Sequence, residues 1–95
     1  MAVMATWTIE YAYDDRDDER DRHRPAHREY LNGLLAAGTL LTYGRYDDDG
    51  APGALLVAVA DDVSGVEKMI AGDPFVAAGL VPEQRIRRWA AVWPE

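Results

Sequence analysis

A turn-rich segment near the middle of this 95-residue chain constrains its fold more than any other feature. Residues 47–53 read Asp-Asp-Asp-Gly-Ala-Pro-Gly, a composition typical of a hairpin connection. They separate a predicted strand, Leu40–Tyr46, from a continuous apolar run, Ala54–Ala60, which predicts an interior strand buried on both faces. Because strands joined by so short a connection pair antiparallel, the pattern favours an antiparallel sheet.

A strand and a helix are predicted on each side of this hairpin. Period-two alternation predicts a strand over Thr6–Tyr13, and an apolar stripe that follows Pro25 and stops at Gly38 predicts a helix. After the hairpin, Val63–Ala71 has helical spacing and Gln84–Trp93 is a predicted last strand. The order β-α-β-β-α-β over residues 1–95 predicts a single α+β domain of ferredoxin-like topology, with a four-stranded antiparallel sheet and two helices on one face.

The segment Asp14–Arg24, between the first strand and the first helix, is almost wholly charged and shows no apolar periodicity. These properties predict a solvated loop, with at most a frayed helical turn, which can act as a lid. Pro25 suits the first turn of a helix, where its missing N–H is no loss, so we expect the helix to begin there.

Large aromatic rings fall in the first and last predicted strands: Trp7, Tyr11, Trp89 and Trp93. Those that face away from the helices need a cover, because large apolar rings on an open sheet face are costly. A second copy of the same sheet is the simplest cover. We therefore expect a homodimer in which two sheets face each other as a dimeric α/β-barrel.

The composition excludes several classes of function. The chain has no cysteine, which excludes disulfides, thiol catalysis and thiolate metal sites. Its net charge of −7, with ten basic residues interleaved among acids, argues against a nucleic acid partner. The start, Met1–Met4, lacks the features of a signal peptide, and no apolar run approaches the roughly 20 residues that cross a bilayer. We expect a cytoplasmic protein with no membrane partner.

Two titratable residues continue the apolar stripes of the predicted helices and are candidate catalytic residues. His27 lies four residues before Leu31 and seven before Leu34, on the same helix face. At a helix N-terminus the dipole disfavours imidazolium and so favours a neutral imidazole that can accept a proton. A buried histidine satisfied by a backbone carbonyl is an equally good interpretation of that position alone.

Asp73 extends the stripe of the second helix by one more helical step. Alone, its Gly-Asp-Pro context is better interpreted as ordinary turn chemistry. In this topology, however, the N-terminus of one helix approaches residues just past the C-terminus of the other, so His27 and Asp73 can meet. A carboxylate that accepts from one imidazole nitrogen fixes the tautomer and leaves the other nitrogen for a substrate.

Three further residues are candidates for substrate binding. Arg24 flanks His27 and can hold an anionic group, although such an Arg more often pairs with nearby acids. Tyr43 can wall a pocket, and Phe75 can close the edge of the core. His23 is four residues from His27, but the expected helix start places it outside the helix and no third ligand lies near in sequence. No metal site and no cofactor are therefore expected.

Three segments also follow a known pattern: Arg-Pro-Ala-His at 24–27 with Tyr-Leu at 30–31, Gly-Thr-Leu-Leu at 38–41 leading to Gly44, and Asp-Pro-Phe-Val-Ala-Ala-Gly-Leu at 73–80. They resemble the YCII-related (YciI-like) proteins over essentially the whole chain. The resemblance implies a ferredoxin-like fold assembled as a dimeric α/β-barrel and an active-site pair that falls on His27 and Asp73. It also implies proton-transfer chemistry, such as elimination or isomerisation, on small cyclic or aromatic molecules.

Three functions fit these residues. The first is a cofactor-independent enzyme of lyase or isomerase type, in which His27 moves a proton on a small cyclic or aromatic molecule and Asp73 orients the imidazole. The second is a non-catalytic dimeric module that binds a small ligand or assists another protein. The third is a structural role, in which the pair is a buried polar link between the helices.

Overall fold

Four strands form one antiparallel sheet in the spatial order β2-β3-β1-β4. The computed structural model describes residues 4–95. The strands are β1 (Ala5–Ala12), β2 (Leu40–Arg45), β3 (Gly53–Ala60) and β4 (Glu83–Trp89). The helices are α1 (Asp17–Ala37), α2 (Val63–Ala71) and α3 (Pro74–Ala77). The expectation of no signal peptide concerns Met1–Met4, of which only Met4 is among the described residues.

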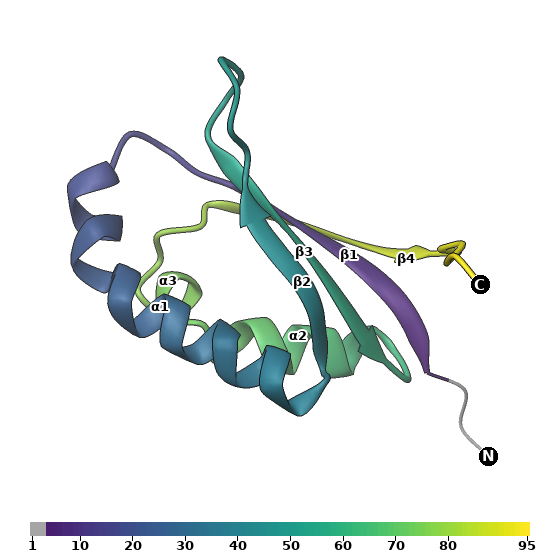
Figure 1. Cartoon of the computed structure of the whole chain (residues 1–95). Coiled ribbons are helices and arrows are strands. Elements are labelled where there is room, and N and C mark those ends of the chain that lie inside the picture. The colour runs from purple at the N-terminus through teal and green to yellow at the C-terminus, as the bar shows by residue number, and fades with distance from the viewer. Residues whose placement is uncertain (1–3) are drawn as a thin grey trace.

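The helices lie on one face of the sheet, and the rest of the described chain leaves the other face uncovered (Figure 1). Strands β1 and β3 occupy the centre of the sheet, and β2 and β4 form its edges. This strand order with one-sided helices is a ferredoxin-like α+β fold, so the predicted fold class is confirmed. Within residues 4–95, none of the helices combines the length and the apolar character needed to traverse a bilayer.

The side chains of β1 alternate between the covered face and the open face of the sheet. Trp7, Ile9 and Tyr11 are buried beneath the helices, and the Trp7 indole N–H donates to a backbone carbonyl of β3 at 3.0 Å. On the open face Thr6 pairs with Trp89, which is 46% exposed. The large rings are therefore divided between the two faces.

Two strand predictions need correction. β3 is an interior strand, but Leu55 on its open face is 37% exposed, because no helix of the described chain covers that face. β4 ends at Trp89 rather than at Trp93. Trp89 pairs with Thr6 at the start of β1, and the pairing of these two strands stops there. Beyond β4 the chain brings the ring of Trp93 edge-on to that of Trp89, 6.2 Å between centroids.

The first helix is longer than predicted. α1 begins at Asp17, so the expected loop Asp14–Arg24 is helical over most of its length, and the prediction of a solvated loop was wrong. Acidic residues fill the first turn, where the helix dipole favours them. Ion pairs at i,i+3, such as Arg22 with Glu19 at 2.5 Å, run along the exposed side. Pro25 lies inside the helix rather than at its start.

A buried arginine holds this N-terminal part of α1 against the domain. Arg20 is 1% exposed and donates to Asp14 at 2.9 Å, to Asp17 at 3.0 Å and to the backbone carbonyl of Leu80 at 3.2 Å. Its guanidinium carbon lies 4.8 Å from the centre of the Tyr13 ring. We call Arg20 with these contacts the anchor of α1. Apolar periodicity does not reveal the anchor, because the buried side chain is charged.

The longer helix changes the surroundings of both histidines. His23 lies inside α1, and its Nδ1 is 3.0 Å from the carbonyl oxygen of Glu19. His27 lies in the helix interior, so the expected influence of a helix N-terminus does not apply to it. Among residues 4–95, no three or more His, Asp or Glu side chains are grouped so as to hold a metal ion.

Candidate active site

A close contact between helices places Asp73 deep in the domain. Just past α2, a Cβ on Gly72 would lie 2.5 Å from the Tyr30 hydroxyl, so a larger residue would displace the Tyr30 ring from its place against α2. The same hydroxyl donates to the carbonyl oxygen of Met69 at 2.6 Å and joins the two helices. The next residue, Asp73, is the N-cap of α3: its Oδ1 accepts from the backbone N–H of Phe75 at 3.0 Å.

His27 reaches this buried carboxylate from α1. Its Nδ1 lies 2.7 Å from Asp73 Oδ1, and its ring stacks on Phe75 with 3.7 Å between centroids and 4° between planes. The hydroxyl of Tyr11 donates to Asp73 Oδ2 at 2.9 Å. The two side chains that the sequence analysis paired therefore do meet. They are 46 residues apart in the chain.

The bond to Asp73 determines what the imidazole can do. When Nδ1 carries the proton that Asp73 accepts, Nε2 holds the free lone pair. Within residues 4–95 Nε2 makes no hydrogen bond, and it is not among the buried polar atoms left without a partner. Since the ring of His27 lines a cavity, the accessible nitrogen is placed to exchange a proton with a bound molecule.

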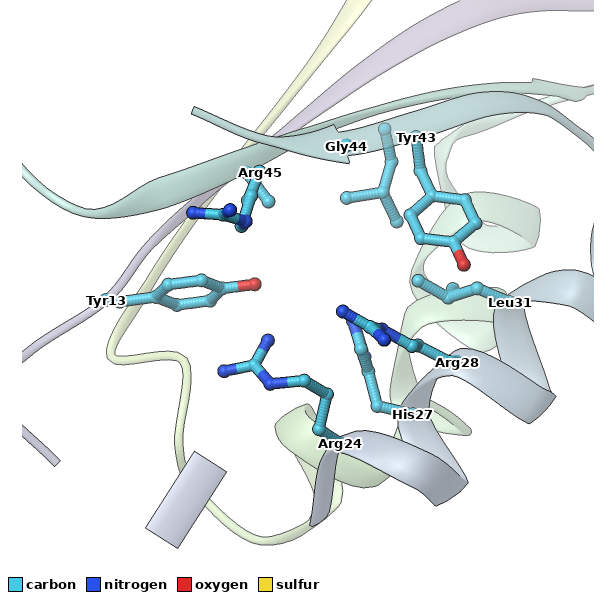
Figure 2. A pocket seen from close by; sticks show the side chains of 10 residues that line it. Tyr13, Arg24, His27, Arg28, Leu31, Tyr43, Gly44 and Arg45 are labelled. Atoms are coloured by element: carbon cyan, nitrogen blue, oxygen red, sulfur yellow. The ribbon is translucent and has the colours of Figure 1, made fainter. Parts of the chain in front are cut away.

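The cavity beside His27 has a volume of about 170 Å³, enough for one substituted ring, since a cavity of about 150 Å³ holds benzene. Its walls come from α1, β2, β3 and the residue after β1: Tyr13, Arg24, His27, Arg28, Leu31, Tyr43, Gly44, Arg45, Ala54 and Leu56. Figure 2 shows the Tyr13 hydroxyl and the guanidinium groups of Arg24 and Arg45 directed toward the same space as His27. The site thus offers a base, a phenol and cationic groups around one small space.

The Tyr13 hydroxyl is a hydrogen-bond donor at neutral pH. Burial, followed by the nearby charge of Asp73, raises the pKa of Tyr13 to about 12, although Arg24 and Arg20 act in the opposite direction. Burial and Asp73 likewise raise the pKa of the Tyr11 phenol, which stays protonated as a donor to that carboxylate. Both phenols therefore keep their protons at neutral pH and can donate a hydrogen bond at this site.

A family comparison identifies the domain to which this fold belongs. The YCII-related domain family matches residues 4–90. The chain belongs to this family. The match confirms the resemblance drawn from the three sequence segments. No curated protein matches the chain.

Several solved structures share the fold of this YCII-related chain. The 5-chloro-2-hydroxyhydroquinone dehydrochlorinase (TftG) from Burkholderia phenoliruptrix AC1100, in complex with 2,5-dihydroxybenzoquinone, is 25% identical with a TM-score of 0.74, and the match covers 88% of this chain and 92% of that one. PA3566 from Pseudomonas aeruginosa is 13% identical with a TM-score of 0.58 over 98% of both chains. Rv0793 from Mycobacterium tuberculosis is 9% identical with a TM-score of 0.56, over 97% of this chain and 98% of that one. The last two show likeness of fold alone.

The candidate substrate-binding residues of this YCII-related protein have different places. Arg24 lines the cavity and also pairs with Asp21 at 3.2 Å. Tyr43 lines it with its ring, while its hydroxyl donates to Asn32 at 2.8 Å. Phe75 does not line the cavity, because it is fully buried and stacks on His27. Its observed role is to support the imidazole.

Sequence reasoning missed three polar cavity residues: Tyr13, Arg28 and Arg45. Tyr13 continues the buried row of β1, and that alternation was a usable signal. Arg45 follows Tyr43 by two residues on β2 and therefore shares its face of the sheet. Arg28 gave no such signal, because an arginine on a helix surface usually lies in solvent.

Proposed function

We propose that this protein is a cofactor-independent enzyme in which His27 moves a proton on a small cyclic or aromatic molecule. The observation that carries the proposal is the 2.7 Å contact between His27 Nδ1 and the buried Asp73, with the ring lining a cavity. Asp73 holds the imidazole in one tautomer and orientation, as an orienting carboxylate does for catalytic histidines. The reaction class that needs only such a base is a lyase or isomerase reaction.

Each side chain has a defined part in this chemistry. Nε2 of His27 removes a proton from the substrate, and Asp73 stabilises the imidazolium that forms. Negative charge then develops on the substrate, and the Tyr13 hydroxyl and the neighbouring guanidinium groups lie around the cavity to stabilise it. General acid–base catalysis of this kind contributes about 100- to 10,000-fold.

The likeness to TftG supports the proposed type of reaction. That protein is a dehydrochlorinase, and dehydrochlorination removes a proton and a chloride ion from one molecule. Its bound 2,5-dihydroxybenzoquinone is a single substituted ring, a size that the cavity beside His27 accommodates. A small hydroxylated ring is therefore the substrate class to test first.

The test is proton exchange on hydroxylated aromatic probes, with 5-chloro-2-hydroxyhydroquinone included for chloride release. The wild-type chain is expected to incorporate solvent deuterium into ring C–H positions, followed by NMR. His27→Gln is expected to lower this rate at least about 100-fold, since the base is lost. Asp73→Asn keeps the side-chain shape but not the carboxylate, and a similar loss is expected.

Tyr46→Phe is the matched control, because it removes only a hydroxyl that donates to Glu10, and Tyr46 does not line this cavity. Its rate should stay near that of the wild type. An exchange rate unchanged by His27→Gln would rule out the proposed base. Ligand binding without any turnover, in wild-type and variants alike, would favour the non-catalytic module.

A further inference from the structure

Three arginine side chains surround the cavity beside His27. Arg24 and Arg28 come from successive turns of α1, and Arg45 comes from the end of β2 on the opposite side (Figure 2). The chain as a whole has a net charge of −7 and only ten Lys and Arg residues. A cavity of about 170 Å³ therefore concentrates positive charge in an otherwise acidic protein.

The arginines differ in their partners. Arg24 pairs with Asp21 on the outer surface of the helix. Within residues 4–95, the side chains of Arg28 and Arg45 form neither an ion pair nor a hydrogen bond. Arginines on β4 also lack an acidic partner among these residues, but none of them lines this cavity. What sets Arg28 and Arg45 apart is their place beside His27.

Arg28 and Arg45 are exposed residues, and a ligand that fills this cavity takes water away from the side of each guanidinium that faces it. Removing a charged group from water is costly unless an opposite charge compensates it. A neutral ring brings no such charge before the proton is removed. A carboxylate compensates the cost in the ground state, and its planar pair of oxygens matches the fork of a guanidinium.

The other residues that line the cavity indicate the size and polarity of the rest of the ligand. Leu31, Ala54 and Leu56 offer an apolar surface for a ring. The volume is close to that of one substituted ring. No glycine-rich phosphate loop is present in the sequence, and the cavity walls are side chains rather than a helix N-terminus, which favours a carboxylate over a phosphate.

We infer that the substrate is a small cyclic or aromatic carboxylic acid, whose carboxylate lies between Arg28 and Arg45 while its ring lies against the apolar wall beside His27. This inference rests on the proposed function of His27 as the base of the same cavity. Arg28 and Arg45 are then specificity-determining residues: they select the charged acid over a neutral ring of equal size. Tyr13 and Arg24 remain for the charge that develops during proton removal.

The test compares two probes that share a ring and differ in charge, 2,5-dihydroxybenzoate and 2,5-dihydroxybenzamide, by titration calorimetry on the full chain. The wild type is expected to bind the acid at least 10-fold more tightly than the amide. Arg28→Gln and Arg45→Gln should each weaken acid binding about 10-fold and leave amide binding unchanged. Arg45→Lys keeps the charge and should retain a preference for the acid.

Arg22→Gln is the matched control, because Arg22 lies on the exposed side of the same helix and pairs with Glu19. It should bind the acid like the wild type. Equal affinity of the wild type for acid and amide would overturn the inference, as would equal losses in Arg22→Gln and Arg45→Gln. Stronger competition by inorganic phosphate than by benzoate would also overturn it.

The His27→Gln variant separates this inference from the proposed function. It should bind the acid within about 3-fold of the wild type, because it leaves both arginines in place. Arginine-dependent acid binding without proton exchange would support the ligand class and refute the proposed reaction. Proton exchange on the amide at the rate of the acid, abolished by His27→Gln, would support the reaction and refute the ligand class.

Discussion

Tyr13 shows how a single side chain acquires its chemistry from its neighbours. Its ring contacts the guanidinium of Arg20 on one side and lies edge-on to Phe75, 5.9 Å between centroids. Burial is the first cause of its raised pKa, and the carboxylate of Asp73 is the second. A phenol in these surroundings keeps its proton, and its hydroxyl group points into the cavity (Figure 2).

The raised pKa of Tyr13 has a consequence for stability at alkaline pH. In the unfolded chain a tyrosine ionises near pH 10, whereas the folded chain holds the Tyr13 proton up to about pH 12. Between these values only the unfolded state releases this proton, so stability is complete below pH 10 and falls as the pH rises. We expect the free energy of unfolding, measured in urea from pH 9 to 12, to decline less steeply in Tyr13→Phe. Equal slopes in the two proteins would contradict this assignment.

Helix α1 is held in two different ways along its length. Its C-terminal part packs by an apolar stripe that includes the buried Leu31. Its N-terminal part is held by Arg20, whose partners Asp14 and Leu80 lie outside the helix. Ordinary helix propensity is not the main source of stability for such a segment, since packing and buried contacts hold it in place.

The anchor predicts a clear difference between two arginines of the same helix. Arg20→Met removes the charge-assisted hydrogen bonds of a buried guanidinium, including the one to the carbonyl oxygen of Leu80, which we expect to cost about 2 kcal/mol of unfolding free energy. Arg22→Met removes an exposed pair with Glu19, worth less than about 1 kcal/mol. Chemical denaturation measures both values. Hydrogen exchange should quicken over residues 17–24 only in Arg20→Met, and equal exchange in both variants would argue against the anchor.

The elements that sequence predicts well are those defined by apolar side chains. The alternation around Trp7 and Ile9 and the stripe through Leu31 follow from burial, and both are present in the structure. His27 and Asp73 were found because each continues such a stripe. The start of α1 was missed because the burial of Arg20 depends on partners as remote as Leu80, which local periodicity does not contain.

At the scale of the molecule, the open face of the sheet is the main feature that no segment of residues 4–95 covers. Leu55 is 37% exposed and Trp89 46% exposed, and Trp93 contacts Trp89 at the end of that face. The sequence predicted that such rings need a cover, but it did not predict which of them face outward, because alternation does not say which row meets the helices. We propose that a second copy of the chain covers this face.

A homodimer joined through this face makes a specific prediction about two exposed apolar residues. Leu55→Glu places a charge on the open face and should convert a wild-type dimer to a monomer in sedimentation velocity experiments. Val63→Glu introduces the same charge on α2, where Val63 is 44% exposed on the other side of the sheet, and should leave the dimer intact. A wild-type protein that sediments as a monomer at micromolar concentration would contradict the proposal.

The carboxylate of Asp73 accepts bonds from His27, from Tyr11 and from the backbone of Phe75 at the start of α3. The fold and the proposed chemistry thus depend on one carboxylate, so a substitution at Asp73 is expected to change both together. Laboratory evolution toward new substrates is therefore expected to tolerate few substitutions of Asp73. Its useful mutations should gather instead at Arg28 and Arg45, whose side chains make no hydrogen bond to any other part of residues 4–95.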